Sequence, residues 1–180
     1  MSNNYKLIFT GPTGAGKTTA ISALSDIPVV ITEEKSTYRD PTHQDKKTIT
    51  VALDYGVINL KNQDKIHLYG TPGQERFDFM WDILTIGGLG LILLVDNART
   101  APLEDMHFFL KAFSRLIEKN KIAIGITRMD LCAEPKLIDY HKELGKVGLK
   151  LPLFEVDARR KSDVSLLLQA LLYSLDPGLN

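Results

Sequence analysis

Short runs of apolar residues alternate along the chain with segments in which apolar residues recur every three or four positions. Four runs have the length of buried strands: residues 6–10, 90–95, 122–126 and 153–156. Helical spacing appears in four other segments: 17–24, 105–118, 135–144 (with Pro135 in the first turn) and 164–175 (with Ser162 or Asp163 as N-cap). Strands that are separated by helices predict a parallel sheet with helices on both faces.

Two further apolar runs, 50–60 and 65–69, are joined by the short turn 61–64, which predicts an antiparallel hairpin. The preceding segment, 32–48, is polar and has no apolar period, so we expect a functional loop there. The pattern as a whole predicts one α/β domain over residues 1–180. Its sheet is expected to have six mostly parallel strands, with one antiparallel strand at the edge.

Composition excludes several classes of protein. Apolar residues make up 44% of the chain, and 22 basic residues balance 22 acidic ones, which argues against a nucleic-acid-binding surface. Cys132 is the single cysteine, so no internal disulfide can form and a reducing compartment fits. We find no signal peptide, lipidation motif or apolar run near the ~20 residues of a membrane span. We therefore expect a cytoplasmic protein with no membrane anchor of its own.

The sequence GPTGAGKT at residues 11–18 fits the pattern G-x-x-x-x-G-K-[ST] between a predicted strand and a predicted helix. Glycines let backbone N–H groups turn toward a phosphate, Lys17 reaches the β- and γ-phosphates, and the Thr18 hydroxyl is a hard ligand for Mg²⁺. A glycine-rich turn without a ligand is the alternative, and the agreement of motif and context argues against it. The predicted phosphate-binding residues are Gly11, Thr13, Gly14, Ala15, Gly16, Lys17, Thr18 and Thr19.

Two loops after predicted strands are candidates for binding the base. Asp130 ends Thr127-Arg128-Met129-Asp130, and its carboxylate can accept hydrogen bonds from guanine N1–H and the 2-amino group. Adenine would leave that carboxylate unpaired, at a cost of about 1–3 kcal/mol. A turn-capping role is the alternative for Asp130. In the second loop, Asp157-Ala158-Arg159, the Ala158 N–H can donate to guanine O6 and its small side chain leaves room for the base.

The sequence GTPGQE at residues 70–75 follows the predicted hairpin. The Gly73 N–H can bind the γ-phosphate, and Gln74 can orient the attacking water, because phosphoryl transfer depends on positioning. A plain β-turn is the alternative. In the polar segment before the hairpin, either Thr48 or Thr50 can offer its hydroxyl to the metal.

The motifs GPTGAGKT, TPGQE, TRMD and DAR, in this order, resemble the four nucleotide-contacting loops of Ras-like small GTPases over essentially the whole chain. The resemblance implies the small-GTPase fold of the P-loop NTPases, GTP and GDP as ligands, Mg²⁺, and slow hydrolysis in a molecular switch. It implies Gln74 as a catalytic residue. It also favours Thr50, four residues before Asp54, as the switch threonine that binds the metal with Thr18 and supports catalysis.

The combination of GTPGQERF with ALDYG at residues 52–56 resembles the bacterial Ras-like GTPases of cell polarity and gliding motility. This narrower resemblance implies a small roadblock-type regulator, a GTPase-activating protein, as the partner. Arg39 and Arg76 are candidates for an internal arginine finger. An apolar cluster just after Gln74 is a candidate partner surface or packing layer: Phe77, Phe79, Met80 and Trp81.

The chain departs from the family pattern at three positions. Gly70 stands where the family has an aspartate that holds Mg²⁺ through a water, and we expect glycine there to permit conformations that aspartate resists. Thr127 replaces the usual asparagine with a shorter side chain. Arg128 replaces lysine, and its stem can lie along the base. These departures motivate an alternative, a GTP-binding interaction module with negligible hydrolysis. A P-loop kinase of small metabolites is a third possibility, which the scattered arginines disfavour.

Overall fold

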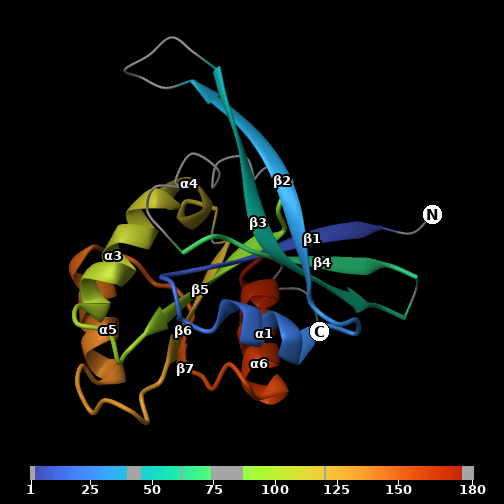
Figure 1. Cartoon of the computed structure of the whole chain (residues 1–180). Helices are drawn as coiled ribbons and strands as arrows, with labels where there is room; N and C mark the ends of the chain where they lie inside the picture. Colours follow the sequence, from blue (N-terminus) through green and yellow to red (C-terminus); the bar gives the residue numbers. More distant parts are fainter. Residues whose placement is uncertain (1–2, 40–45, 62, 74–86, 120, 176–180) are drawn as a thin grey trace.

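The structure is a computed structural model that describes residues 3–39, 46–61, 63–73, 87–119 and 121–175, and of residues 32–39 and 46–52 only the backbone. Figure 1 shows the chain. The elements are β1 (Asn4–Thr10), α1 (Lys17–Leu24), β2 (Val30–Arg39), β3 (Lys46–Asn59), β4 (Lys65–Gly70), β5 (Gly90–Asp96), α3 (Pro102–Ala112), α4 (Ser114–Ile117), β6 (Ile122–Thr127), α5 (Leu137–Lys146), β7 (Leu153–Glu155) and α6 (Lys161–Leu175).

The strands form one sheet in the order β2-β3-β4-β1-β5-β6-β7. From β4 to β7 neighbouring strands are parallel, whereas β3 is antiparallel to both β2 and β4. The predicted α/β class and the hairpin are confirmed. The strand count differs, because the sheet has seven strands rather than six, and the edge strand is β2 rather than the antiparallel β3.

The prediction of a loop over residues 32–48 was wrong. This segment contains most of β2 and the start of β3, which pair continuously from Val30 opposite Tyr55 to Arg39 opposite Lys46. Figure 1 shows this hairpin extending beyond the rest of the sheet. Backbone pairing in such a ribbon needs no apolar alternation, and the threonines and the tyrosine in the segment favour extended backbone. A search for buried, period-two patterns therefore missed it.

The helices agree with the predicted segments except at their ends and in segment 105–118, which is divided at Phe113 into α3 and α4. Helix α1 has the predicted bounds, whereas the third predicted segment begins later, because Lys136 is the N-cap of α5 and Pro135 precedes the helix. The backbone N–H of Lys136 donates to Asp139 Oδ2 at 3.1 Å. Helix α6 begins at Lys161, so Ser162 and Asp163 lie in its first turn rather than at its N-cap.

The sheet is covered on both faces, as predicted. Side chains of α3 and α5, including Met106, Phe109 and Tyr140, pack with one set of strand residues. Side chains of α1 and α6, including Ile21 and Leu167, pack with the other set. All residues of β5 and β6 are buried, as expected for central parallel strands.

Two strand glycines let α6 approach the sheet closely. A Cβ on Gly125 would lie 2.7 Å from Leu167 Cδ1, and one on Gly90 would lie 2.9 Å from Leu171 Cδ2. Both leucines are fully buried, so they occupy the volume that side chains at these two positions would fill. In the part of the chain that the structure describes, none of the helices combines the length and the apolarity needed to cross a lipid bilayer.

Candidate nucleotide-binding site

The predicted phosphate loop joins β1 to α1 and contains three glycines in left-handed conformations. Gly11, Gly14 and Gly16 have φ angles of 134°, 83° and 96°. Other residues are strained in this region, so the loop path requires glycine. Two of the three also allow close contacts: a Cβ on Gly11 would lie 2.0 Å from the Leu94 carbonyl oxygen, and one on Gly16 would lie 3.0 Å from Ala158 Cβ.

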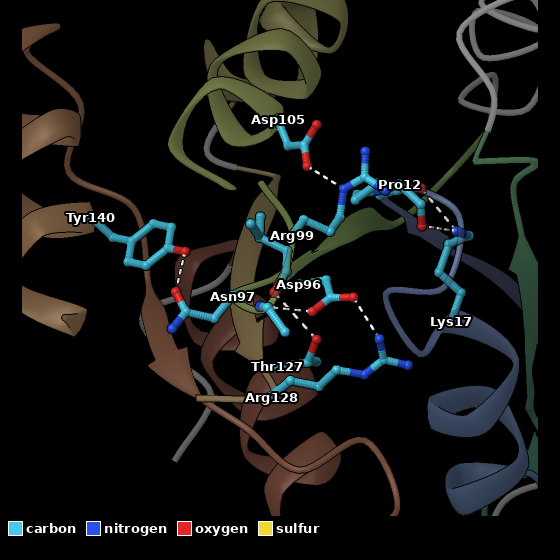
Figure 2. Close-up of polar contacts among 12 residues, drawn as sticks. Pro12, Lys17, Asp96, Asn97, Arg99, Asp105, Thr127, Arg128 and Tyr140 are labelled. Atoms are coloured by element: carbon cyan, nitrogen blue, oxygen red, sulfur yellow. Dashed lines mark hydrogen bonds and ion pairs between the residues drawn. The ribbon is translucent and has the colours of Figure 1, made fainter. Parts of the chain in front are cut away.

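Lys17 is buried inside this loop. Its Nζ donates to the carbonyl oxygens of Gly11 at 2.8 Å and Pro12 at 2.7 Å, as Figure 2 shows for Pro12. Burial lowers the pKa of Lys17 to about 8, the negative charge of Asp54 raises it, and the positive charge of Arg99 lowers it. The positive charge of the ammonium group is thus shielded from water and only partly offset by Asp54, so the negative charge of a phosphate would stabilise it.

Thr18, expected to bind Mg²⁺, donates its hydroxyl hydrogen to Oδ2 of Asp54 on β3. Asp54 lies opposite Gly70, the residue that replaces the family's aspartate at the end of β4. In this structure Gly70 lies in a regular strand with φ outside the left-handed region, and its expected backbone freedom stays a prediction. A Cβ there would lie 3.1 Å from both Asp54 Cβ and Ile21 Cδ1, so glycine relieves a tight contact at this position.

The segment after β4 packs against the phosphate loop. The Thr71 N–H donates to the Phe9 carbonyl oxygen at 2.8 Å, and the hydroxyls of Thr71 and Thr10 lie 2.9 Å apart. A Cβ on Gly73 would lie 2.4 Å from the backbone nitrogen of Thr13. Gly73 thus lies against the phosphate loop, where only glycine fits.

Thr127 ends β6 and reaches the phosphate loop. Its hydroxyl donates to the Ala15 carbonyl oxygen at 3.1 Å and lies 3.3 Å from that of Val95. Despite its shorter side chain, Thr127 therefore links the predicted base loop to the predicted phosphate loop. The Arg128 guanidinium pairs with the buried carboxylate of Asp96 at 2.7 Å, and its backbone has a φ of 59° (Figure 2).

A buried polar network holds the chain just beyond Asp130. The Tyr140 hydroxyl donates to Asn97 Oδ1 at 2.6 Å (Figure 2). Asn97 Nδ2 donates to the Cys132 carbonyl oxygen at 2.8 Å. Tyr140 and Asn97 are fully buried, and burial raises the pKa of Tyr140 above its usual value. The network fixes the base loop to α5 and to the end of β5.

The second base loop lies beside the first. Arg159 binds Asp157 through two hydrogen bonds of 2.8 Å, which hold the pKa of Asp157 well below its usual range. A cavity of about 620 Å³ opens between the phosphate loop and the ends of β6 and β7. Its lining includes residues predicted to bind the phosphates and residues predicted to bind the base: Ala15, Gly16 and Thr19 of the first set, and Thr127, Arg128, Asp130, Asp157, Ala158 and Arg159 of the second.

Residues 9–175 match the profile of a family described as conserved hypothetical ATP-binding proteins. This chain belongs to that family. As a member of the ATP-binding family it is a nucleotide-binding P-loop NTPase. The uncharacterized protein MJ1339 of Methanocaldococcus jannaschii is 33% identical over 124 residues, which are 69% of this chain and 68% of that protein.

More distant relatives include the Ras-related protein RABA1h of Arabidopsis thaliana, which is 25% identical over 66% of this chain. The chain matches only about half of that relative's length, 49%. The solved G domain of the FeoB iron transporter of T. maritima is similar in fold, with a TM-score of 0.64 and 18% identity over 96% of this chain and 99% of that one. These matches establish the P-loop G-domain-like fold for this member of the ATP-binding family. The narrower resemblance to polarity GTPases stays a prediction.

Several predicted roles concern residues that the structure does not describe. Gln74, Arg76 and the cluster from Phe77 to Trp81 lie outside the described residues. Thr48 and Thr50 lie in β3 opposite Thr37 and Lys35 of β2, and Arg39 is the last residue of β2. The structure gives no side-chain positions for them, so their roles stay predictions.

Sequence reasoning missed Asp54 as a side chain of the site and also missed Arg99. The Arg99 Nε donates to Asp105 Oδ2 at 2.5 Å, and Figure 2 shows Arg99 on the segment after β5, toward the phosphate loop. The signal for Arg99 was its position just past a buried strand, at the carboxyl edge where ligands bind in open α/β sheets.

Proposed function

We propose that this chain is a guanine-nucleotide-binding switch, a single domain that binds GTP with Mg²⁺ and hydrolyses it slowly to GDP and phosphate. The observation that carries the proposal is the 620 Å³ cavity, whose lining includes Ala15 and Gly16 of the phosphate loop together with Asp130. A nucleotide needs both ends: donors for the phosphates and a selective group for the base.

The choice of guanine rests on the chemistry of Asp130. Its carboxylate accepts hydrogen bonds, and guanine offers two donors on one edge where adenine offers an acceptor at N1. The family description speaks of ATP, whereas the Arabidopsis relatives are Ras-related proteins. The exposed Asp130 and the small Ala158 favour guanine between these two bases.

The chain's own groups divide the work along the nucleotide. Backbone N–H groups of residues 13–18 and the N-terminus of α1 bind the phosphates, and the Lys17 ammonium turns from the carbonyls that it now contacts to the β- and γ-phosphates. Thr127 keeps the phosphate and base loops in register through its bond to Ala15. The second base loop closes the pocket with Ala158, whose N–H donates to guanine O6.

The Thr18 hydroxyl and the Asp54 carboxylate are hard oxygen groups beside the phosphate loop, a donor set that fits Mg²⁺. When bound, Mg²⁺ would offset the negative charge that develops on the phosphates. Thr50 is proposed as the second protein ligand and Gln74 as the residue that orients the attacking water. The Gly73 N–H binds the γ-phosphate in this scheme.

A slow intrinsic reaction gives the switch its lifetime, and a regulatory partner, proposed to be of the roadblock type, shortens it. The competing function is a GTP-binding interaction module with negligible hydrolysis, motivated by Gly70 and Thr127. Phosphate release from GTP, with and without a lysate of the source cells, separates these two functions. Stimulated release supports the switch, and undiminished GTP binding without any stimulation supports the module.

Displacement of a fluorescent GDP by GDP, ADP and XDP tests the base assignment. The wild type should prefer GDP to ADP by about 5- to 150-fold, because ADP leaves the Asp130 carboxylate unpaired at a cost of about 1–3 kcal/mol. Asp130→Asn should reverse the order of GDP and XDP, because xanthine presents an oxygen that the asparagine amide can bind. Glu104→Gln, which removes an exposed carboxylate in the first turn of α3, should behave as the wild type. Preference for ADP in the wild type would contradict the guanine assignment.

A further inference from the structure

The space beside Gly70 is filled by a side chain from the neighbouring strand. Asp54 and Gly70 are direct partners in the antiparallel pair of β3 and β4. A Cβ on Gly70 would lie 3.1 Å from Asp54 Cβ and 3.2 Å from Asp54 Oδ2. Both distances are shorter than ordinary contacts, so a larger residue at position 70 would displace the Asp54 side chain. The sheet thus has a carboxylate at this place, supplied by β3 instead of β4.

The Asp54 carboxylate also faces the phosphate loop. The hydroxyl of Thr18, the second residue of α1, donates to its Oδ2. Its charge is felt by Lys17 as well, where it raises the lysine's pKa against the larger effect of burial. One carboxylate therefore acts on both side chains that are expected to meet the β- and γ-phosphates and the metal.

A carboxylate in this position could support a bound Mg²⁺ ion. Mg²⁺ in nucleotide sites keeps several waters and takes one or two protein ligands, and neighbouring carboxylates orient those waters by accepting their hydrogen bonds. Within the described residues, no group of three or more His, Cys, Asp and Glu side chains could hold a metal ion by itself. That agrees with an ion bound mainly by phosphate and hydroxyl oxygens, with a single carboxylate nearby.

We propose that Asp54 is the carboxylate that supports the nucleotide-bound Mg²⁺, and that position 70 is glycine to leave room for it. The inference rests on the proposed binding of a nucleotide with Mg²⁺ and is independent of the base. In this chain a carboxylate on β3 would thus take the place of the carboxylate that the family has at the end of β4.

The competing explanation gives Asp54 a structural role, in which it only fastens α1 to β3 through Thr18. Asp54→Asn separates the two, because the amide keeps the size of the side chain and an oxygen that can accept from Thr18, but lacks the charge. A structural role predicts equal effects with and without Mg²⁺. A metal-supporting role predicts an effect that appears when Mg²⁺ is present and is nearly absent in EDTA.

The experiment measures the release rate of a methylanthraniloyl-labelled GDP from the full chain over a series of buffered free Mg²⁺ concentrations. In the wild type, Mg²⁺ should slow release with a defined midpoint. Asp54→Asn should raise that midpoint about 10- to 100-fold and leave the rate in EDTA within about threefold. Glu104→Gln, the matched loss of one exposed carboxylate, should keep the wild-type midpoint. The same series with labelled ADP gives the comparison for the other base.

A double variant tests the geometry directly by moving the carboxylate back to β4. Asp54→Ala with Gly70→Asp removes the Asp54 carboxylate, whose Oδ2 a Cβ at position 70 would approach to 3.2 Å. The Cβ of residue 54 and Ile21 Cδ1 remain at 3.1 Å and have to shift by a few tenths of an ångström, while the strand backbone at position 70 accepts any L residue. The double variant should restore the midpoint to within about fivefold of the wild type, while Asp54→Ala alone should match Asp54→Asn. If Asp54→Asn does not fold, which thermal unfolding would reveal, this double variant decides.

Three outcomes would overturn the inference. Asp54→Asn with the wild-type midpoint, or with release accelerated equally in EDTA and in Mg²⁺, removes the metal-supporting role. A folded double variant with the same midpoint as Asp54→Ala would show that a carboxylate at position 70 cannot replace the one at position 54. Failure of the proposed function looks different, because the wild type itself would then bind neither labelled nucleotide or release it independently of Mg²⁺.

Discussion

The hydroxyl of Thr127 donates to the carbonyl oxygen of Ala15 at 3.1 Å and so joins the end of β6 to the phosphate loop. Thr127→Val removes this donor without changing the shape of the side chain. We expect a loss of about 1 kcal/mol in the free energy of unfolding and an approximately five- to tenfold weaker affinity for GDP. Denaturant unfolding and GDP titration measure the two effects.

Thr127→Ser is the control for this position, because serine keeps the hydroxyl and loses only a methyl group. Its GDP affinity should stay within about twofold of the wild type. If the valine and serine variants bind GDP equally well, the bond to Ala15 does not organise the site.

Gly73→Ala places a methyl group 2.4 Å from the Thr13 nitrogen, so either the phosphate loop or the segment after β4 has to move. Because the Gly73 N–H is proposed to bind the γ-phosphate, GTP should lose affinity by more than about tenfold and GDP by much less. Competition between the two nucleotides for the labelled GDP measures the ratio. Gly145→Ala in α5, where a Cβ meets nothing within 4 Å, should leave the ratio unchanged.

Lys17 makes nucleotide binding depend on pH. Its pKa without nucleotide is about 8, below the ordinary 10.5, and phosphates should raise it again. Binding therefore takes up protons above pH 8, and affinity is fully present below that pH and falls as pH rises through it. At pH 8.5 we expect uptake of about 0.7 proton and an approximately fourfold weaker affinity than at pH 7.

Calorimetric titrations in two buffers of different ionisation enthalpy measure this proton uptake. The same titrations at pH 7 are the control, because Lys17 is then mostly protonated before the nucleotide binds. Binding heats at pH 8.5 that do not depend on the buffer would contradict the assignment. The free energy of unfolding of the nucleotide-free protein depends on pH in the opposite direction. It should rise between pH 8 and 10.5, because the unfolded chain binds more protons than the folded chain in that range.

Tyr140→Phe removes the donor to Asn97 Oδ1 and leaves a fully buried amide oxygen without it. We expect the free energy of unfolding to fall by about 1–3 kcal/mol. Tyr173→Phe, a change at an exposed position on α6, should stay within about 0.5 kcal/mol of the wild type. Equal unfolding midpoints for the two variants would show that the Tyr140–Asn97 bond contributes nothing.

The fold class, the parallel core of the sheet and the β3–β4 hairpin could be predicted from the sequence because their residues are buried. Strands such as β5 and β6 have apolar residues on both faces, and helices such as α3 have a clear apolar side. The β2–β3 ribbon could not be predicted this way, because its pairing depends on backbone hydrogen bonds that leave no apolar pattern. Segment 32–48 therefore looked like a loop.

In the candidate site, too, some residues could be predicted from the sequence and others could not. The phosphate and base loops are contiguous motifs, so Lys17, Thr127 and Asp130 could be named from local spacing alone. The contact between Thr18 and Asp54 joins residues 36 positions apart and depends on the register of two antiparallel strands. A shift of one residue would turn Asp54 to the other face of the sheet, and the sequence does not locate the turn that finely.

The contact of Gly125 with Leu167 has a consequence for the evolution of this family. Position 125 of β6 has no side chain and position 167 of α6 has a large one. Packing between them constrains the combined volume of the two side chains and not the identity of either residue. Relatives with alanine or serine at position 125 should therefore have a smaller aliphatic residue at 167. Leu167→Val should relieve Gly125→Ala in part, since a Cβ at position 125 would also lie 2.8 Å from Val156 Cγ2 and 2.9 Å from Leu94 Cδ2. Aligned relatives would reveal this exchange as correlated substitution between β6 and α6.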